Sequence, residues 1–283
     1  MVTSAGALPA RQRALNPQHV ALLFAMRAKL TLRGYQRRKI TATIGVILAL
    51  LLVLGVIGEM SAVSYVGYTR LPHALAVQVL FVVLTGLYIA WIALPLLQYS
   101  LNEGLDVTKL VILPVTRVER MAALLLATLL DIGTLAIVAF FIPILLAWSR
   151  SPAALAIVLL ALLLAYAHTV AMSQLVLAAM MGVLRNRRWR DLSIVLFAVI
   201  GTSCSFAGQF ASRFFEHINP RQGAEQFQGI HLDPYLQFTP PGMAARAIEL
   251  AARGQYLPAL GWAGALVALL PVVLVLWSWV LDR

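Results

Sequence analysis

Two ionisable side chains, Asp131 and His168, lie inside long apolar stretches of the sequence, where a charge is costly. The stretches meet at a short polar turn around Arg150. Counted from that arginine, Asp131 is 19 residues away and His168 is 18, so at 1.5 Å per residue both helices would place them about 27–28 Å from the turn. We therefore expect Asp131 and His168 to form an intramembrane polar pair between antiparallel helices.

Two interpretations of this pair remain open. Ionisable residues inside a membrane are functional candidates, so the pair could handle a proton or a cation or line a substrate path. It could instead be a hydrogen bond that holds two helices together. No third ionisable partner accompanies the two residues, which favours the structural interpretation.

A second set of polar residues is concentrated in the loop over residues 100–120. One helical face of this loop carries polar side chains, namely Asn102, Asp106 and Lys109. Pro114 interrupts the helical pattern, and Thr116 to Glu119 has the spacing of a capping box. The loop is thus predicted to hold a short amphipathic helix, a break and a newly capped helix, an arrangement suited to passing motion from a partner protein into the membrane.

A third group of residues predicts a short helix late in the chain, within the polar segment over residues 211–257. Thr239 precedes two prolines, which is typical of a capped helix start. Glu249 and Arg253 are spaced to form an ion pair on one helical face, and Gly254 is a natural stop. Such a helix is too short and too charged to span a bilayer, so we expect it at the outer surface or partly inserted, packed against protein.

The composition is that of a membrane protein. Of the 283 residues, 61% are hydrophobic and 12% are charged, whereas soluble domains carry about 25% charged residues. Several apolar runs exceed the roughly 20 residues that cross a bilayer. The single cysteine, Cys204, allows no disulfide framework within the chain. The sequence has no P-loop and no HExxH, CxxC or GxSxG pattern, so we expect no catalytic residues, no metal ligands and no cofactor of its own.

The predicted fold is an all-α polytopic membrane protein with six transmembrane helices. An interfacial amphipathic helix precedes them, and the short outer helix lies between spans five and six. The expected spans are Ile40–Ala62, His73–Tyr99, Met121–Trp148, Pro152–Leu184, Leu192–Phe210 and Pro258–Val280. These spans and the interfacial helix form a single domain over residues 16–283.

The N-terminal part and the charge distribution predict the orientation. Residues 1–15 are expected to be a flexible cytoplasmic tail, and residues 16–39 a basic helix in the membrane interface. Sixteen lysines and arginines fall on the proposed inner side and six on the outer side, so the positive-inside rule places both termini in the cytoplasm. The net charge of +11 then reflects topology and contact with lipids, not nucleic-acid binding. We expect a multi-pass protein of the plasma (cytoplasmic) membrane.

The order of these features resembles the permease subunits of type-2 ATP-binding-cassette (ABC) exporters. Two short strings carry the resemblance together with the six-span architecture. The first is Leu113-Pro114-Val115-Thr116-Arg117, at the end of the loop over residues 100–120, and the second is Pro240-Pro241-Gly242, at the start of the outer helix. The resemblance covers nearly the whole chain.

The resemblance implies a function and a set of site residues. The chain would export a substrate by pairing with a separate P-loop ATPase subunit, which binds ATP and Mg, and with a second permease chain as a homo- or heterodimer. Contacts with the ATPase would come from Asn102, Glu103, Asp106, Lys109, Arg117, Arg27, Lys29 and Arg33. An outer gate would contain Thr239, Pro240, Pro241, Gly242, Arg246 and Glu249.

Two other function classes compete with the permease. The chain could be a non-transporting scaffold or regulatory subunit of a membrane complex. It could also be an intramembrane enzyme that uses Asp131 and His168, but that chemistry needs a further acid, base or nucleophile at the same depth, and the sequence offers none. The substrate has no recognisable signature in the sequence.

Overall fold

The structure is a computed structural model, and the chain divides into two compact units. One unit comprises Met1–Ile44 with Asp106–Asp131, and the other comprises Gly45–Leu105 with Ile132–Arg283. The helices described below belong to the second unit. The described residues are 57–101, 132–184 and 233–281, together with the single helical residues Ala21, Ala25, Gly55, Met121 and Leu125. Within these ranges the regular secondary structure is entirely helical.

Among the described helices, three are long and apolar enough to cross a membrane, which is consistent with a helical membrane protein. They are α3 (His73–Leu101), α6 (Pro152–Leu184) and α11 (Tyr256–Leu281). Their bounds agree within two residues with the second, fourth and sixth predicted spans. A shorter apolar helix, α5 (Ile132–Trp148), ends at the residue predicted for the end of the third span.

The helix of the first predicted span continues past the predicted end of that span. A helix covers residues 57–70 and therefore continues about two turns beyond Ala62. Leu71 N–H still donates to the Gly67 carbonyl at 3.2 Å, but Pro72 disfavours helical backbone at the residue before it. The proline, not the change to more polar residues, sets the end of the helix. The N-terminal part of this span and the whole fifth span lie outside the described residues.

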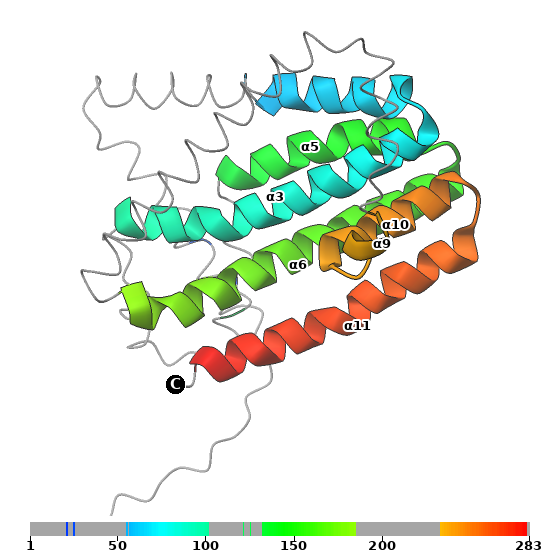
Figure 1. The fold of residues 1–283 in the computed structure, drawn as a ribbon. Coiled ribbons are helices and arrows are strands. Elements are labelled where there is room, and N and C mark those ends of the chain that lie inside the picture. Colours follow the sequence, from blue (N-terminus) through cyan, green and yellow to red (C-terminus); the bar gives the residue numbers. More distant parts are fainter. Residues whose placement is uncertain are drawn as a thin grey trace, which may run out of the picture. The chain divides into compact units, whose positions relative to one another are not determined.

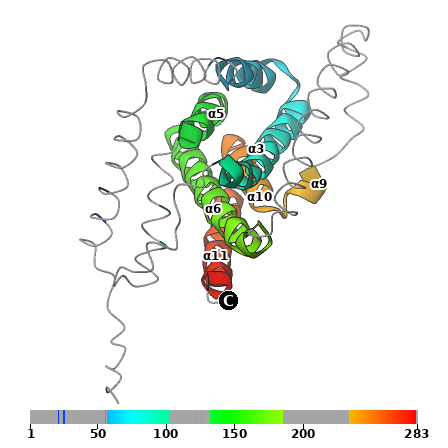
Figure 2. The ribbon, with the colours of Figure 1, turned by 90° about the vertical axis from the view of Figure 1, so that its left-hand side faces the viewer.

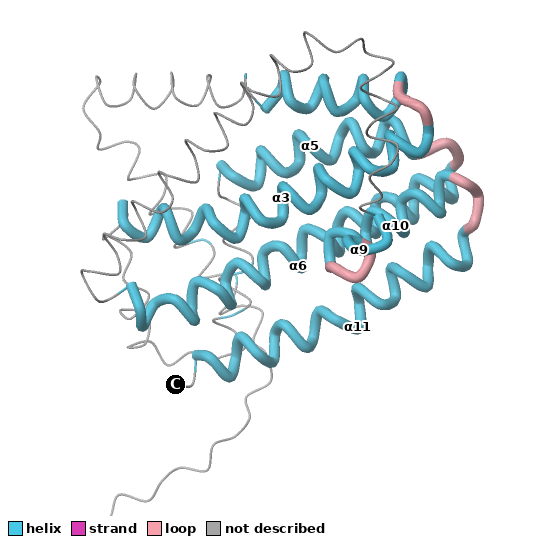
Figure 3. The backbone as a smooth tube through the Cα atoms, in the orientation of Figure 1, coloured by secondary structure: helices cyan, strands magenta, loops and turns pink. Residues whose placement is uncertain are grey.

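The long helices pack side by side, with α6 in contact with α3, α5 and α11 (Figures 1 and 2). Three loops lie together at one end of this bundle (Figure 3). They join the helix over residues 57–70 to α3, α5 to α6, and α10 (Pro240–Ala252) to α11. We call this end of the bundle the turn end.

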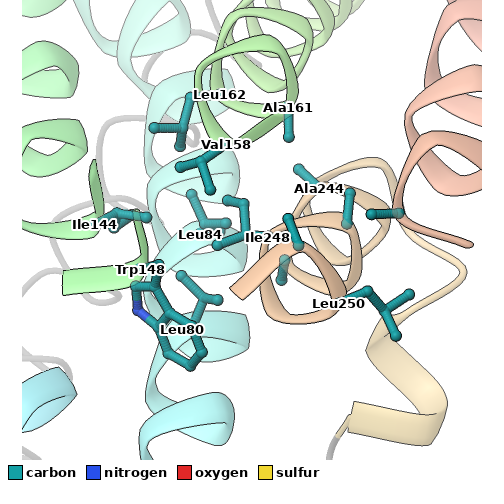
Figure 4. Packing of buried hydrophobic residues seen from close by; sticks show 14 of the residues in the cluster. Leu80, Leu84, Ile144, Trp148, Val158, Ala161, Leu162, Ala244, Ile248 and Leu250 are labelled. Carbon is teal, nitrogen blue, oxygen red and sulfur yellow. The ribbon is translucent and has the colours of Figure 1, made fainter. Parts of the chain in front are cut away.

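Helix α10 packs into the middle of the bundle near the turn end, against α3, α6 and α11 (Figure 2). Its inner face consists largely of alanines, and Ala244, Ala245 and Ala247 are fully buried. Small side chains let helices approach closely, so Ile248 reaches the core formed with Leu80 (Figure 4). The expectation that this short helix packs against protein is confirmed.

The C-terminus of α10 is fixed by a Schellman motif. Gly254 has a φ of 77°, which favours glycine. Gly254 N–H donates to the Ala251 carbonyl at 3.0 Å, and Gln255 N–H donates to the Leu250 carbonyl at 2.9 Å. These bonds satisfy the last carbonyls of α10 and turn the chain directly into α11, as predicted from Gly254.

Candidate functional site

The predicted gate residues begin at a tight corner between a single helical turn, α9 (Asp233–Leu236), and α10. The Thr239 hydroxyl donates to the Leu236 carbonyl at 2.7 Å and accepts a hydrogen bond from Gly242 N–H at 3.3 Å. Pro240 and Pro241 occupy the first helical positions, where a missing N–H costs nothing. The predicted capped start of this helix is confirmed.

Gly242 is required at this corner by the close approach of the backbone. A Cβ at this position would overlap the Leu236 carbonyl and lie 3.0 Å from Gln237 Cα. The carbonyl cannot withdraw easily, because it accepts hydrogen bonds from both the N–H and the hydroxyl of Thr239. The Thr-Pro-Pro-Gly string is therefore a geometric unit that sets the angle between α9 and α10.

A buried carboxylate lies one turn before the end of α10. Glu249 is only 1% exposed, and its two oxygens bind different arginines. Arg246 Nη1 lies 2.5 Å from Oε2, and Arg253 Nη2 lies 2.6 Å from Oε1. Burying a carboxylate is tolerated when it is paired in this way. The predicted ion pair between Glu249 and Arg253 is confirmed, and Arg246 adds a second partner.

Arg253 extends the same network to another helix. Its Nε–H donates to His73 Nε2 at 3.1 Å, so the imidazole accepts through that nitrogen. The His73 ring also lies 5.9 Å from the indole of Trp148, at the end of α5. The four side chains of Arg246, Glu249, Arg253 and His73, which we call the arginine cluster, therefore join the end of α10 to the beginning of α3.

A further contact at the turn end joins α6 to α11. The Ser151 hydroxyl lies 2.9 Å from the Tyr256 hydroxyl and also accepts a hydrogen bond from Ala154 N–H at 3.1 Å. It thus caps the start of α6 while it contacts the first residue of α11. The ends of α3, α5, α6, α10 and α11 are consequently linked by polar or aromatic contacts.

The interior beside α10 is closely packed. A cavity at Pro241 has a volume of about 10 Å³, and its walls come from α3, α5, α6 and α10. This is about the space of one water molecule. An open groove of about 360 Å³ lies between the helix over residues 57–70 and α5, and apolar side chains form most of its walls. In the described part of the chain, α10 therefore closes the space between its neighbours.

His168 is fully buried in α6, and its partner there is a backbone group of another helix. Its Nε2–H donates to the Leu266 carbonyl of α11 at 2.7 Å. The other ring nitrogen, Nδ1, has no hydrogen-bond partner within the described residues. Asp131, the partner predicted for His168, lies outside the described residues, so the predicted pair remains a prediction.

The residues expected to contact an ATPase also lie outside the described residues. These are Asn102, Glu103, Asp106, Lys109, Arg117, Arg27, Lys29 and Arg33. By contrast, the six predicted gate residues are all described, and the structure places them in one corner and one helix.

Sequence reasoning missed two residues of the site, His73 and Trp148. His73 is 180 residues away from Arg253 in the chain, so no local spacing could reveal the contact. The sequence feature that could have indicated a role for His73 is its position directly after Pro72, at a helix start and hence in a polar turn.

Comparison of the chain with protein-family models, curated proteins and solved structures finds no match.

Proposed function

We propose that the chain is the permease subunit of an ATP-driven ABC exporter, which moves its substrate together with a separate P-loop ATPase subunit. The observation that carries this proposal is the position of α10. This short helix lies between long apolar helices, runs toward the turn end and leads directly into the last one (Figure 1). An outer gate of the expected type needs such an arrangement, because a short helix can move without unfolding a complete span.

In this proposal the turn end faces outward and α10 is in its closed position. The cavity of about 10 Å³ beside Pro241 leaves no room for a substrate. Opening would separate the alanine face of α10 from α3 and α6, while the Schellman turn keeps α10 attached to α11. The arginine cluster holds the gate closed by joining Arg253 to His73 at 3.1 Å.

The energy would come from the partner, because the sequence has no P-loop. The loop over residues 100–120 would dock on the ATPase, and its capped exit at Thr116 would pass the movement into the third span. A second permease chain would complete the pathway. Both termini would lie in the cytoplasm of a cell bounded by the plasma (cytoplasmic) membrane, on the same side as the ATPase.

Co-purification tests the proposal. The full chain is purified in mild detergent from its native membrane, and nucleotide-binding chains that travel with it are identified by mass spectrometry. We expect an ATPase to co-purify and to hydrolyse ATP. Asp106→Lys and Lys109→Glu should each release it, because they reverse charges on the docking face. Arg70→Glu is the matched control, since Arg70 lies at the turn end, and it should retain the ATPase.

Two results together would overturn the permease proposal. One is the absence of any nucleotide-binding chain from the purified complex, and the other is unchanged complex composition after both charge reversals. A stable complex with other membrane proteins under those conditions would identify the chain as a scaffold or regulatory subunit.

A further inference from the structure

The arginine cluster carries more positive charge than its one carboxylate neutralises. One carboxylate, Glu249, faces two guanidinium groups, so the ion pairs leave an excess of one positive charge. Arg150 is exposed on the turn between α5 and α6, two residues after Trp148, whose ring lies 5.9 Å from the His73 ring. No hydrogen bond or ion pair satisfies Arg150 within the described residues. The arginine cluster and the adjacent turn therefore contain three arginines and one carboxylate.

The guanidinium groups are held in place but are not enclosed. The side chain of Glu249 is 1% exposed, whereas those of Arg246 and Arg253 are 30% and 45% exposed. Each guanidinium has five N–H donors. Arg246 uses one nitrogen on Glu249, and Arg253 uses Nη2 on Glu249 and Nε on His73. The remaining N–H donors are left for solvent or a ligand. The buried carboxylate already orients the planar guanidinium groups that carry them.

The location favours one class of ligand. The cluster lies at the turn end, where the exposed Tyr256 begins α11 and its hydroxyl contacts that of Ser151. Amphipathic aromatic rings at the ends of membrane helices are typical of the headgroup level of a bilayer. Phosphate groups are abundant at that level, and the planar guanidinium fork binds them with two parallel hydrogen bonds.

We propose that the arginine cluster, together with Arg150, is a binding site for one phosphate group, carried either by a lipid headgroup or by a free phosphate. Arg253 and Arg246 supply oriented donors, Glu249 and His73 orient them, and Arg150 closes the site from the neighbouring turn. The site stabilises the end of α10 against α3 when it is occupied. This proposal does not depend on transport or on an ATPase.

Ligand-dependent stability of the full chain in a phosphate-free, uncharged detergent tests the site. The probes are inorganic phosphate, dihexanoyl phosphatidylglycerol and, as a zwitterionic comparison, dihexanoyl phosphatidylcholine. A bound ligand raises the unfolding midpoint in a concentration-dependent way. Tighter binding of phosphatidylglycerol than of inorganic phosphate identifies a lipid source. Equal or tighter binding of inorganic phosphate identifies a free source.

Matched variants separate a specific site from general attraction. Arg150→Gln should weaken binding roughly tenfold, the size expected for losing one hydrogen bond to a charged group. It should fold normally, because Arg150 makes no hydrogen bond or ion pair within the described residues. Arg253→Lys keeps the charge but removes the fork, so it should weaken binding as well.

Arg70→Gln changes the net charge by the same amount at the same end of the molecule, and it should bind like the unmodified chain. The proposal is overturned if no probe raises the unfolding midpoint of the unmodified chain. It is also overturned if Arg70→Gln and Arg150→Gln weaken binding equally, because the attraction would then be general and not that of a built site.

Discussion

At the scale of single residues, Glu249 has the most demanding environment. Its carboxylate is buried against the alanine-rich packing of α10, and both oxygens are used by arginines. Removing one partner from such a pair leaves a buried polar group without compensation. The free-energy cost of that group exceeds the net stabilisation that the intact pair provides. The arginines are partly exposed, however, so solvent screens part of that cost.

Replacing the carboxylate tests this balance. Glu249→Gln should lower the free energy of unfolding by about 2 kcal/mol, because a neutral amide cannot hold two guanidinium groups at once. Chemical unfolding of the full chain in detergent measures the change. Glu59→Gln is the matched control on an exposed helical position, where we expect a change below about 0.5 kcal/mol. Equal effects of the two variants would show that the paired carboxylate of Glu249 contributes no more to stability than an exposed one.

Gly242 supports a second prediction at this scale. Gly242→Ala places a Cβ against the Leu236 carbonyl, so it should destabilise the chain by about 1–3 kcal/mol, as overpacked sites do. Gly264→Ala in α11 is the control, because nothing lies within 4 Å of its added Cβ. The control should be neutral or slightly stabilising, since alanine favours helix. Thermal unfolding distinguishes the two, and a stable Gly242→Ala variant would contradict the geometry of the corner.

At the scale of helices, the hydrogen bond between His168 and Leu266 couples α6 to α11. It lies next to a weak point of α11, since Pro271 has no N–H to donate to the Val267 carbonyl one turn earlier. A helix interrupted in this way can bend. His168 donates to the carbonyl directly before that of Val267, so it fixes α11 beside the place where its own hydrogen bonding is incomplete.

His168→Leu should therefore weaken the contact between α6 and α11. We expect a loss of about 1 kcal/mol, within the range measured for hydrogen bonds between membrane helices. Ser173→Ala is the control, because the buried Ser173 hydroxyl donates to the Val170 carbonyl of its own helix and should contribute less. Unfolding measurements compare the two. If His168→Leu folds with unchanged stability but abolishes transport, the functional interpretation replaces the structural one.

The sequence predicted helices better than contacts between them. Apolar length alone located α3, α6 and α11, and the Thr-Pro-Pro start and the Gly254 stop located α10, because caps and prolines act over a few residues. The same local rules explain why the helix continues past Ala62, since the composition changes there but Pro72 ends the helix. The contact of His73 with Arg253 was not predictable, since it depends on which helices become neighbours.

At the scale of the whole molecule, the charge distribution bears on which side of the membrane the turn end faces. The three loops at that end carry one arginine each, in or beside the loop, namely Arg70, Arg150 and Arg253, whereas residues 185–190 alone contain four arginines. The positive-inside rule therefore predicts that the turn end faces outward and that the arginine-rich segment faces the cytoplasm. The two regions should then react from opposite sides of the membrane.

Cysteine labelling tests this arrangement, and the chain is suited to it because Cys204 is its only cysteine. In a Cys204→Ser background, Leu71→Cys, Arg150→Cys and Gln255→Cys each place one thiol in a different loop of the turn end, at exposed positions. An impermeant maleimide added to intact cells should label all three. Asn186→Cys should react only after the membrane is permeabilised. Labelling of the three loop positions from different sides would contradict the bundle itself, whereas uniform labelling from the cytoplasmic side would invert the topology and place the arginine cluster at the inner leaflet.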